Sequence, residues 1–154
     1  MKFVEFGKNY RLKNREPFRE DTSMENKSNK EETLGYPKKV IKLLNDSKFF
    51  GRMNDPTSSS YLKGPCGDSM EFYLVIEDKR ITDIKYYTDG CGATRACAAM
   101  TAHLAYGKTI NEALAISAGE VIKQLKGLPE NHLHCSILSV STLYRAIADY
   151  LLRE

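Results

Sequence analysis

Three of the four cysteines in this chain stand where a thiol can take part in chemistry. Cys66 lies in the segment 64–68 (GPCGD), Cys91 lies between two glycines, and Cys135 directly follows a histidine. Glycine and proline beside a cysteine indicate a turn that displays the thiol, whereas a thiol that only fills core volume needs no such neighbours. Because the three cysteines are far apart in the sequence, we expect the fold to assemble them into one site.

Residues beside these cysteines add further types of ligand. Asp68 lies two residues after Cys66, so its carboxylate reaches the same space if the local backbone is extended. His134 offers an imidazole nitrogen next to the sulfur of Cys135. Cys91 and Cys135 each lie near the predicted start of a helix, where backbone NH groups stabilise a thiolate. The predicted donors are therefore three sulfurs, one nitrogen and one oxygen.

This mixture of donors narrows the choice of metal. Thiolates select zinc or iron–sulfur clusters over magnesium or calcium. Permanent iron–sulfur clusters are usually held by thiolates alone, so a carboxylate in the set predicts a cluster that is weakly held and readily exchanged. Four cysteines in 154 residues fall short of a disulfide-rich composition, which favours roles as ligands or nucleophiles in a reducing compartment.

Structural roles compete with these chemical ones. Cys97 falls in an alanine-rich helical run without an adjacent glycine, so we expect it to fill core volume. His103, on the same predicted helix, is expected at the surface or with a hydrogen-bond partner, and Asp68 could simply cap a turn. His132 is compatible with solvent-facing polarity and also with the site, because it lies three residues before Cys135.

Composition and charge exclude several functional classes. A hydrophobic content of 42% and a charged content of 28% are typical of a globular protein. The net charge of +3, without a run of Lys or Arg, does not indicate nucleic acid binding. No apolar stretch approaches the ~20 residues that span a bilayer, and the first thirty residues hold no secretory signal. We therefore expect a cytoplasmic protein with neither a nucleic acid nor a membrane partner.

The order of predicted elements indicates one α+β domain at 36–154, after an N-terminal extension at 1–35. The extension is rich in charged and small polar residues and is predicted to be flexible, with at most a short strand at 1–6. The domain is predicted to hold a three-stranded antiparallel sheet with about five helices packed mainly on one face. Its predicted elements are a helix opened by Pro37, a loop at 51–60, strands near 61–62 and at 70–77 and 80–88, a helix at 93–106, capped helices after Thr109 and Ser117, and a last helix through Leu151.

Taken as a set, the motifs resemble one known family. The segments that match are 64–68 (GPCGD), 87–93 (YTDGCGA), 107–109 (GKT), 134–138 (HCSIL) and 146–150 (AIADY). In order, spacing and flanking glycines they closely resemble the IscU/NifU-type iron–sulfur cluster scaffolds, over about residues 36–152. The resemblance implies a three-stranded antiparallel sheet with helices on one face, and a scaffold rather than an enzyme.

The resemblance also implies a function and a set of site residues. Such scaffolds accept sulfur from a cysteine desulfurase, take up iron and electrons, build a [2Fe–2S] cluster and transfer it to apo-proteins. Family members also bind zinc in place of the cluster. Carried over motif by motif, Cys66, Asp68, Cys91 and Cys135 are the metal ligands, with His134 as an alternative ligand. Cys135 is then the persulfide acceptor, and Asp68 is the carboxylate that favours cluster release.

Departures from the family pattern leave other points open. The segment 128–132 (LPENH) stands where IscU has a chaperone recognition stretch, so chaperone dependence is open, and His132 replaces the family lysine. The oligomeric state, monomer or dimer, is open as well. One rival function is a zinc-binding sulfur acceptor of the SufU type, although its characteristic insertion between Cys91 and Cys135 is missing. Another is a structural zinc module, although no CxxC pair occurs.

Overall fold

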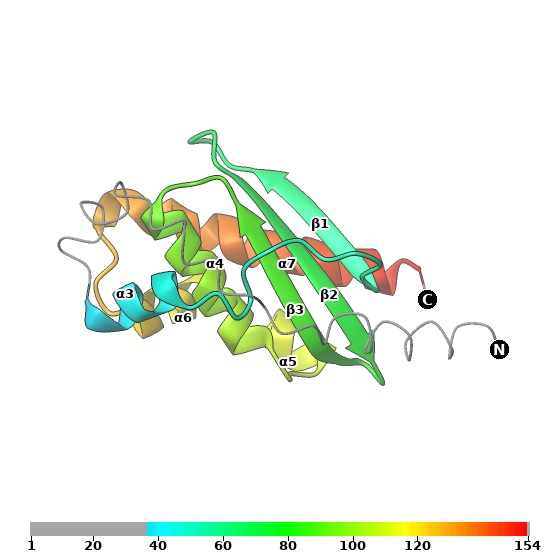
Figure 1. The fold of residues 1–154 in the computed structure, drawn as a ribbon. Helices are drawn as coiled ribbons and strands as arrows, with labels where there is room; N and C mark the ends of the chain where they lie inside the picture. Colours follow the sequence, from blue (N-terminus) through cyan, green and yellow to red (C-terminus); the bar gives the residue numbers. More distant parts are fainter. Residues whose placement is uncertain (1–36, 154) are drawn as a thin grey trace.

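The computed structural model describes residues 37–153, so the predicted N-terminal extension at 1–35 and its short strand lie outside the described residues. In the described part, helices precede and follow three consecutive strands in the sequence (Figure 1). In chain order the elements are α3 (Lys38–Asn45), β1 (Ser58–Lys63), β2 (Ser69–Glu77), β3 (Arg80–Thr88), α4 (Gly92–Ala105), α5 (Ile110–Leu114), α6 (Ala118–Leu125), the 3₁₀ helix η2 (Glu130–His132) and α7 (Leu133–Leu151).

A three-stranded antiparallel sheet in the order β1–β2–β3 forms the centre of the fold. β2 and β3 are joined by Asp78 and Lys79, which both take positive φ angles, 51° and 58°. A left-handed pair of this kind is the geometry of a type I′ turn, whose twist matches that of the two strands. The predicted hairpin is thereby confirmed, with strand bounds within one residue of the expectation.

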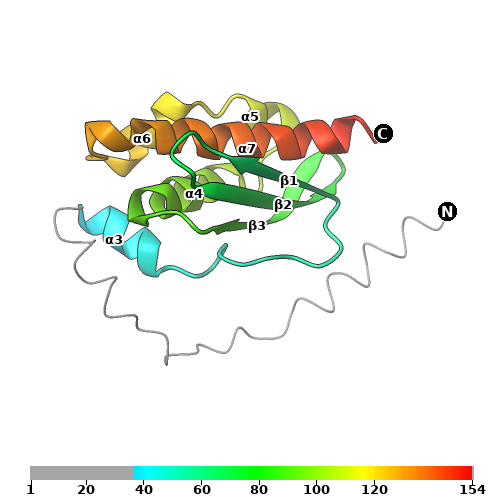
Figure 2. The same ribbon diagram turned by 90° about the horizontal axis from the view of Figure 1, so that it is seen from above.

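One face of the sheet is apolar and carries the helices. In β2 the side chains of Met70, Phe72 and Leu74 are fully buried, and the residues between them point to the other face. α7 packs on β1 and β2, and α4 packs beside it on β3 (Figure 2). α3, α5 and α6 pack against α4, and α5 and α6 also contact α7. The predicted α+β class, with helices mainly on one face, is confirmed.

The predicted loop at 51–60 is three residues too long. β1 begins at Ser58, which pairs with Leu74 of β2. Three successive serines indicate a loop by propensity, but here Ser60 donates a hydrogen bond of 2.6 Å to the carbonyl of Thr142 in α7. Contacts to β2 and α7 therefore override the local preference, as they often do for strands.

Helix caps follow the sequence closely. Thr109 accepts a hydrogen bond from the NH of Glu112, whose carboxylate accepts from the NH of Thr109, which completes the predicted capping box. Ser117 accepts from the NH of Glu120 in the same way at the start of α6. These caps fix where α5 and α6 begin.

α7 is 19 residues long and contributes buried side chains to the hydrophobic core along its length. Leu143 and Ile147 are fully buried on its inner face, whereas Ile137 and Leu151 are exposed. Among the described residues, no helix combines the length and the apolarity that crossing a membrane requires.

We predict that Leu143→Ala lowers the free energy of unfolding by about 2–5 kcal/mol, because truncation of the fully buried side chain leaves a cavity in the hydrophobic core. Guanidinium unfolding followed by circular dichroism measures this. Leu152→Ala is the matched control: Leu152 is 86% exposed, and its truncation should change the free energy by less than about 0.5 kcal/mol. Equal effects of the two substitutions would contradict the placement of the core.

Candidate metal centre

Three segments that are distant in sequence converge at one end of the sheet (Figure 1). They are the β1–β2 turn with Cys66 and Asp68, the β3–α4 junction with Cys91, and the start of α7 with Cys135. The topology accounts for this arrangement. The β1–β2 turn and the end of β3 lie at the same end of an antiparallel sheet, and α7 begins there before it runs along β1 and β2.

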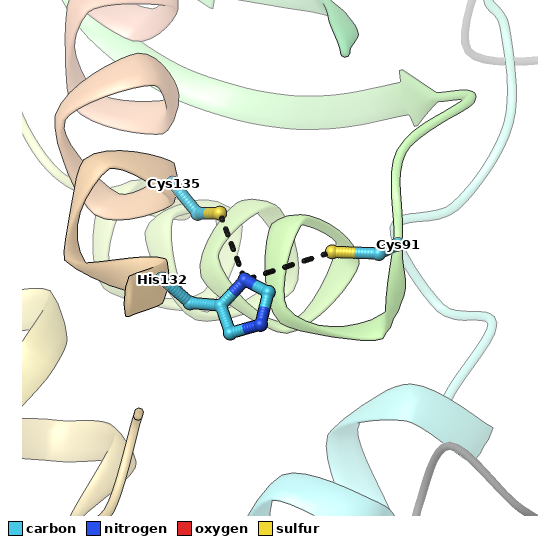
Figure 3. Close-up of side chains that lie close together, drawn as sticks. All are labelled: Cys91, His132 and Cys135. Carbon is cyan, nitrogen blue, oxygen red and sulfur yellow. Dashed lines mark hydrogen bonds between the residues drawn. The ribbon is translucent and has the colours of Figure 1, made fainter. Parts of the chain in front are cut away.

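The side chains of Cys91, His132 and Cys135 point toward one another (Figure 3). His132 Nδ1 lies 4.0 Å from the Sγ of Cys91 and 4.0 Å from the Sγ of Cys135. The three donor atoms all lie within 4.8 Å of one another, so within the described part of the chain this trio could hold a metal ion. η2 leads directly into α7, which places His132 and Cys135 one turn apart on the same side.

A buried hydroxyl, which the sequence analysis missed, connects Asp68 to the two thiols. Thr94 Oγ1 donates a hydrogen bond of 2.6 Å to Asp68 Oδ2, and it lies 3.3 Å from Cys135 Sγ and 3.6 Å from Cys91 Sγ. Thr94 is fully buried in the first turn of α4. Its position three residues after Cys91 is the one signal that could have identified it, since residues i and i+3 share a helix face.

The remaining predicted ligands lie around this group. Cys66 is exposed in the β1–β2 turn, which is closed by a hydrogen bond of 2.8 Å from the NH of Gly64 to the carbonyl of Asp68. His134 Nε2 lies 3.7 Å from Cys135 Sγ. The trio that could hold an ion includes neither Cys66, Asp68 nor His134, so the structure joins Asp68 to the site through Thr94.

Gly90 is required by the close approach of these groups. A Cβ atom there would lie 2.6 Å from Asp68 Oδ2 and 2.8 Å from Thr94 Cβ. Real Cβ atoms do not approach other atoms this closely, so a larger residue would displace the carboxylate or the start of α4. The glycine before Cys91 thus leaves room for the Asp68–Thr94 pair.

Burial dominates the electrostatics of Cys135. The pKa of this thiol is raised to about 11, and loss of solvent is the largest cause. The contact with Thr94 opposes this rise, and the neighbouring Cys91, Cys66 and Asp68 contribute to it. The expectation that the start of α7 favours a thiolate at Cys135 is therefore wrong for the metal-free protein, because burial raises the pKa of the thiol more than the contact with Thr94 lowers it.

The two residues expected to have structural roles do have them. Cys97 is fully buried in the hydrophobic core of α4, and burial raises the pKa of its thiol. His103 Nε2 lies 3.5 Å from Asp46 Oδ2, and its ring packs edge-on against Phe49. Partial burial lowers the pKa of His103 despite the nearby carboxylate.

Comparison with known proteins places this geometry in context. The family described as "NifU-like N terminal domain" matches residues 35–154. The iron–sulfur cluster assembly scaffold protein IscU 1 of Archaeoglobus fulgidus is 40% identical over 116 residues, which cover 75% of this chain and 76% of the relative. The IscU scaffold protein of Escherichia coli K12 is 33% identical over 122 residues, which cover 76% of this chain and 94% of the relative.

The fold has a counterpart among solved structures. The crystal structure of a nitrogen-fixing NifU-like protein (N-terminal) from Brucella abortus aligns with a TM-score of 0.61. The alignment covers 79% of this chain and 98% of that protein, at 17% sequence identity. At this low identity the likeness concerns the fold alone.

We predict that iodoacetamide modifies Cys66 much faster than Cys135 in the folded, metal-free protein. A pKa of about 11 leaves only about one thousandth of Cys135 as thiolate at pH 8, and its rate should rise about tenfold per pH unit up to pH 10. Mass spectrometry of the modified peptides measures both rates. In urea the two rates should become similar. Equal rates in the folded protein at pH 8 would refute the effect of burial.

We also predict that Gly90→Ala lowers the free energy of unfolding by about 1–3 kcal/mol, because the added methyl group overpacks the Asp68–Thr94 contact. It should weaken zinc binding as well, measured by competition with a chromogenic chelator. Gly119→Ala in α6 is the matched control, because its Cβ would meet only Ser117 Oγ at 3.8 Å. That change should stabilise the protein by about 0.4–1 kcal/mol. If Gly90→Ala changed neither the free energy of unfolding nor the zinc affinity, the prediction would be wrong, and the backbone at this end of the sheet would have to shift to accommodate the methyl group.

Proposed function

The chain belongs to the NifU-like N-terminal domain family, and from this membership and the geometry of the site we propose that it is a scaffold on which iron–sulfur clusters are assembled. Its IscU relatives are named as iron–sulfur cluster assembly scaffold proteins. The observation that carries the proposal is the convergence of Cys91, Cys135 and the Thr94-bound Asp68 at one end of the sheet. A soft pair of sulfurs next to a hard carboxylate suits iron that is bound and then given up.

Sulfur enters the proposed reaction as a persulfide from a cysteine desulfurase. The Cys135 thiolate attacks the terminal sulfur of that persulfide, so a new S–S bond forms on Cys135 and the desulfurase thiolate leaves. Two electrons from an external reductant then release the sulfur as sulfide and return Cys135 to its thiolate. Because Cys135 is buried and mainly protonated, this step requires the start of α7 to open. The exposed Cys66 is the alternative acceptor.

Iron is the second substrate of the scaffold. We assign its binding to Cys66, Asp68, Cys91 and Cys135, with His134 as the alternative nitrogen ligand. Two ferrous ions and two sulfides make the [2Fe–2S] core. Oxidation of both irons to the ferric state supplies the two electrons that reduce one of the two persulfides, so the external reductant supplies only the two electrons for the other. The exposed turn that carries Cys66 gives an apo-protein access to one side of the cluster.

Release is the proposed task of Asp68. A carboxylate binds a sulfide-bridged iron less firmly than a thiolate does, so this bond is the first to exchange with a cysteine of the recipient. The proposed partners are therefore a cysteine desulfurase and apo iron–sulfur proteins, in the cytoplasm. The segment that would recognise a chaperone is LPENH at 128–132, and chaperone dependence is a separate question.

A zinc-binding sulfur acceptor is the second candidate function. The observation that favours it is the trio of Cys91, His132 and Cys135, because two sulfurs and one imidazole form a common donor set for zinc. In that case the protein would accept persulfide sulfur while zinc stays bound. Iron would have no part in the reaction.

Anaerobic reconstitution separates the two functions. The full chain is mixed with ferrous iron, cysteine, a cysteine desulfurase and dithiothreitol, and an apo-ferredoxin is then added while visible circular dichroism is followed. We expect a cluster spectrum that grows on this protein and then moves to the ferredoxin. Cys91→Ser should abolish the spectrum, whereas Cys97→Ala should preserve it because Cys97 lies in the core. Retained zinc, no cluster and a faster desulfurase would support the sulfur acceptor instead.

We predict that Asp68→Ala retains the cluster but slows its transfer. The ligand that exchanges most easily is lost, and the remaining ligands leave the cluster more slowly. Cluster yield and transfer rate are measured separately by circular dichroism in the same assay. Asp83→Ala is the control: this aspartate accepts a hydrogen bond from the NH of Ile84 in the middle of β3, away from the thiols. Faster transfer from Asp68→Ala would eliminate the proposed role of the carboxylate.

A further inference from the structure

We propose that the scaffold first receives a single divalent ion on Cys91, His132 and Cys135, with His132 Nδ1 as a direct ligand, before Cys66 and Asp68 take part. The inference rests on the proposed function only in taking ferrous iron as the natural ion. It assigns a metal-binding role to His132, which stands where the family pattern has lysine.

The distances show how little the trio must move. Zinc binds sulfur at about 2.3 Å and imidazole nitrogen at about 2.0–2.1 Å, so sulfur and nitrogen ligands of one tetrahedral ion lie roughly 3.5 Å apart. His132 Nδ1 lies 4.0 Å from both sulfurs. Each of these two sulfur–nitrogen distances therefore needs to shorten by about half an ångström. The two sulfurs lie within 4.8 Å of each other and would lie roughly 3.8 Å apart on one tetrahedral ion, so rotations of the imidazole and the thiols must close both gaps.

The orientation of the imidazole supports the same role. Figure 3 shows the ring of His132 between the two sulfurs, with one nitrogen facing both. That nitrogen can present its lone pair to an ion when the proton of the neutral ring resides on Nε2. By contrast, the recorded sulfur contact of His134 is with Cys135 alone, at 3.7 Å from Nε2. The two histidines thus approach the site differently, and only His132 reaches both cysteines.

Asp68 is not part of the gathered trio in the same structure. Its Oδ2 accepts the hydrogen bond from the fully buried Thr94, which orients the carboxylate toward that hydroxyl. Cys66 lies in an exposed turn and is outside the trio. The donor atoms that already lie close together are therefore two sulfurs and one nitrogen. A fourth coordination position is left for solvent or a later ligand.

This donor set determines which ions can enter. Two thiolates and an imidazole prefer ferrous iron, cobalt and zinc, whereas magnesium and calcium prefer oxygen ligands. An open fourth position is typical of sites that bind a further reactant rather than of closed structural zinc sites. Entry through the trio, followed by recruitment of Asp68 and Cys66, would build the cluster site in two stages.

Cobalt(II) tests the inference without any assembly reaction. The metal-free full chain is titrated anaerobically with cobalt, and thiolate-to-cobalt charge transfer and the visible d–d bands are recorded. We expect one tetrahedral cobalt per chain. His132→Ala should raise the dissociation constant by about tenfold or more and reduce the d–d intensity. His134→Ala is the competing variant and should raise the constant less than His132→Ala does, because His134 contacts Cys135 alone. The matched control is His103→Ala, which removes a histidine paired with Asp46 and should leave both the constant and the spectrum as in the unaltered chain.

Cysteine variants and magnetic resonance complete the test. Cys91→Ser should weaken the charge-transfer band, whereas Cys66→Ser should preserve it. In the cobalt-loaded protein, a paramagnetically shifted imidazole NH signal should be present in His134→Ala and absent from His132→Ala and His132→Gln, the latter of similar size to histidine. The opposite pattern for the two histidines, or a band that depends on Cys66 and not on Cys91, would overturn the inference.

The same experiments separate this inference from the proposed function. Cobalt binding requires neither desulfurase nor sulfide, so a trio that binds cobalt as expected while reconstitution fails would remove the scaffold function alone. A scaffold that assembles and transfers clusters, but binds cobalt equally well after His132→Ala, would remove the role of His132 alone.

Discussion

The hydrogen bond from Thr94 to Asp68 is the interaction on which the site depends. It joins the β1–β2 turn to the first turn of α4, and the same hydroxyl lies 3.3 Å from Cys135 at the start of α7. Thr94 is fully buried, so leaving its hydroxyl without a partner would cost about 1–3 kcal/mol. The positions of three elements and of the reactive groups are therefore set together, and Gly90 supplies the space this requires.

Burial gives the metal-free site two cysteines of different character. Cys135 is enclosed, and the raised pKa keeps its thiol neutral, whereas Cys66 is open to solvent. Metal binding changes the protonation of Cys135, because an ion binds the thiolate form and its binding releases the proton of the thiol. A buried thiol that becomes a ligand only when an ion arrives resists oxidation in the meantime. Cys97, which is deeper still, packs in the hydrophobic core.

Local signals explain what could be predicted from the sequence. The β2–β3 hairpin and the Thr109 cap depend on neighbouring residues, so their sequences specify them, and the alanine-rich surroundings of Cys97 indicated its burial. The start of β1 at Ser58 depends on pairing with β2, which propensity does not register. Thr94 was missed because its role comes from residues 26 and 41 positions away. The protonation of Cys135 depends on burial, which a helix start alone does not reveal.

The sequence separations between contacting residues also affect the order in which these contacts form during folding. The hairpin at Asp78 and Lys79 closes over two residues, so its loop-closure entropy is small and it can form early. Contacts that join Thr94 to Asp68 and to Cys135 close much longer loops and should form late and open first. Cargo that binds only the closed arrangement adds about 2.7 kcal/mol at one hundred times its dissociation constant. Under the proposed function, the scaffold would thus be tightened by the cargo it binds, and release of the cargo would remove that stabilisation.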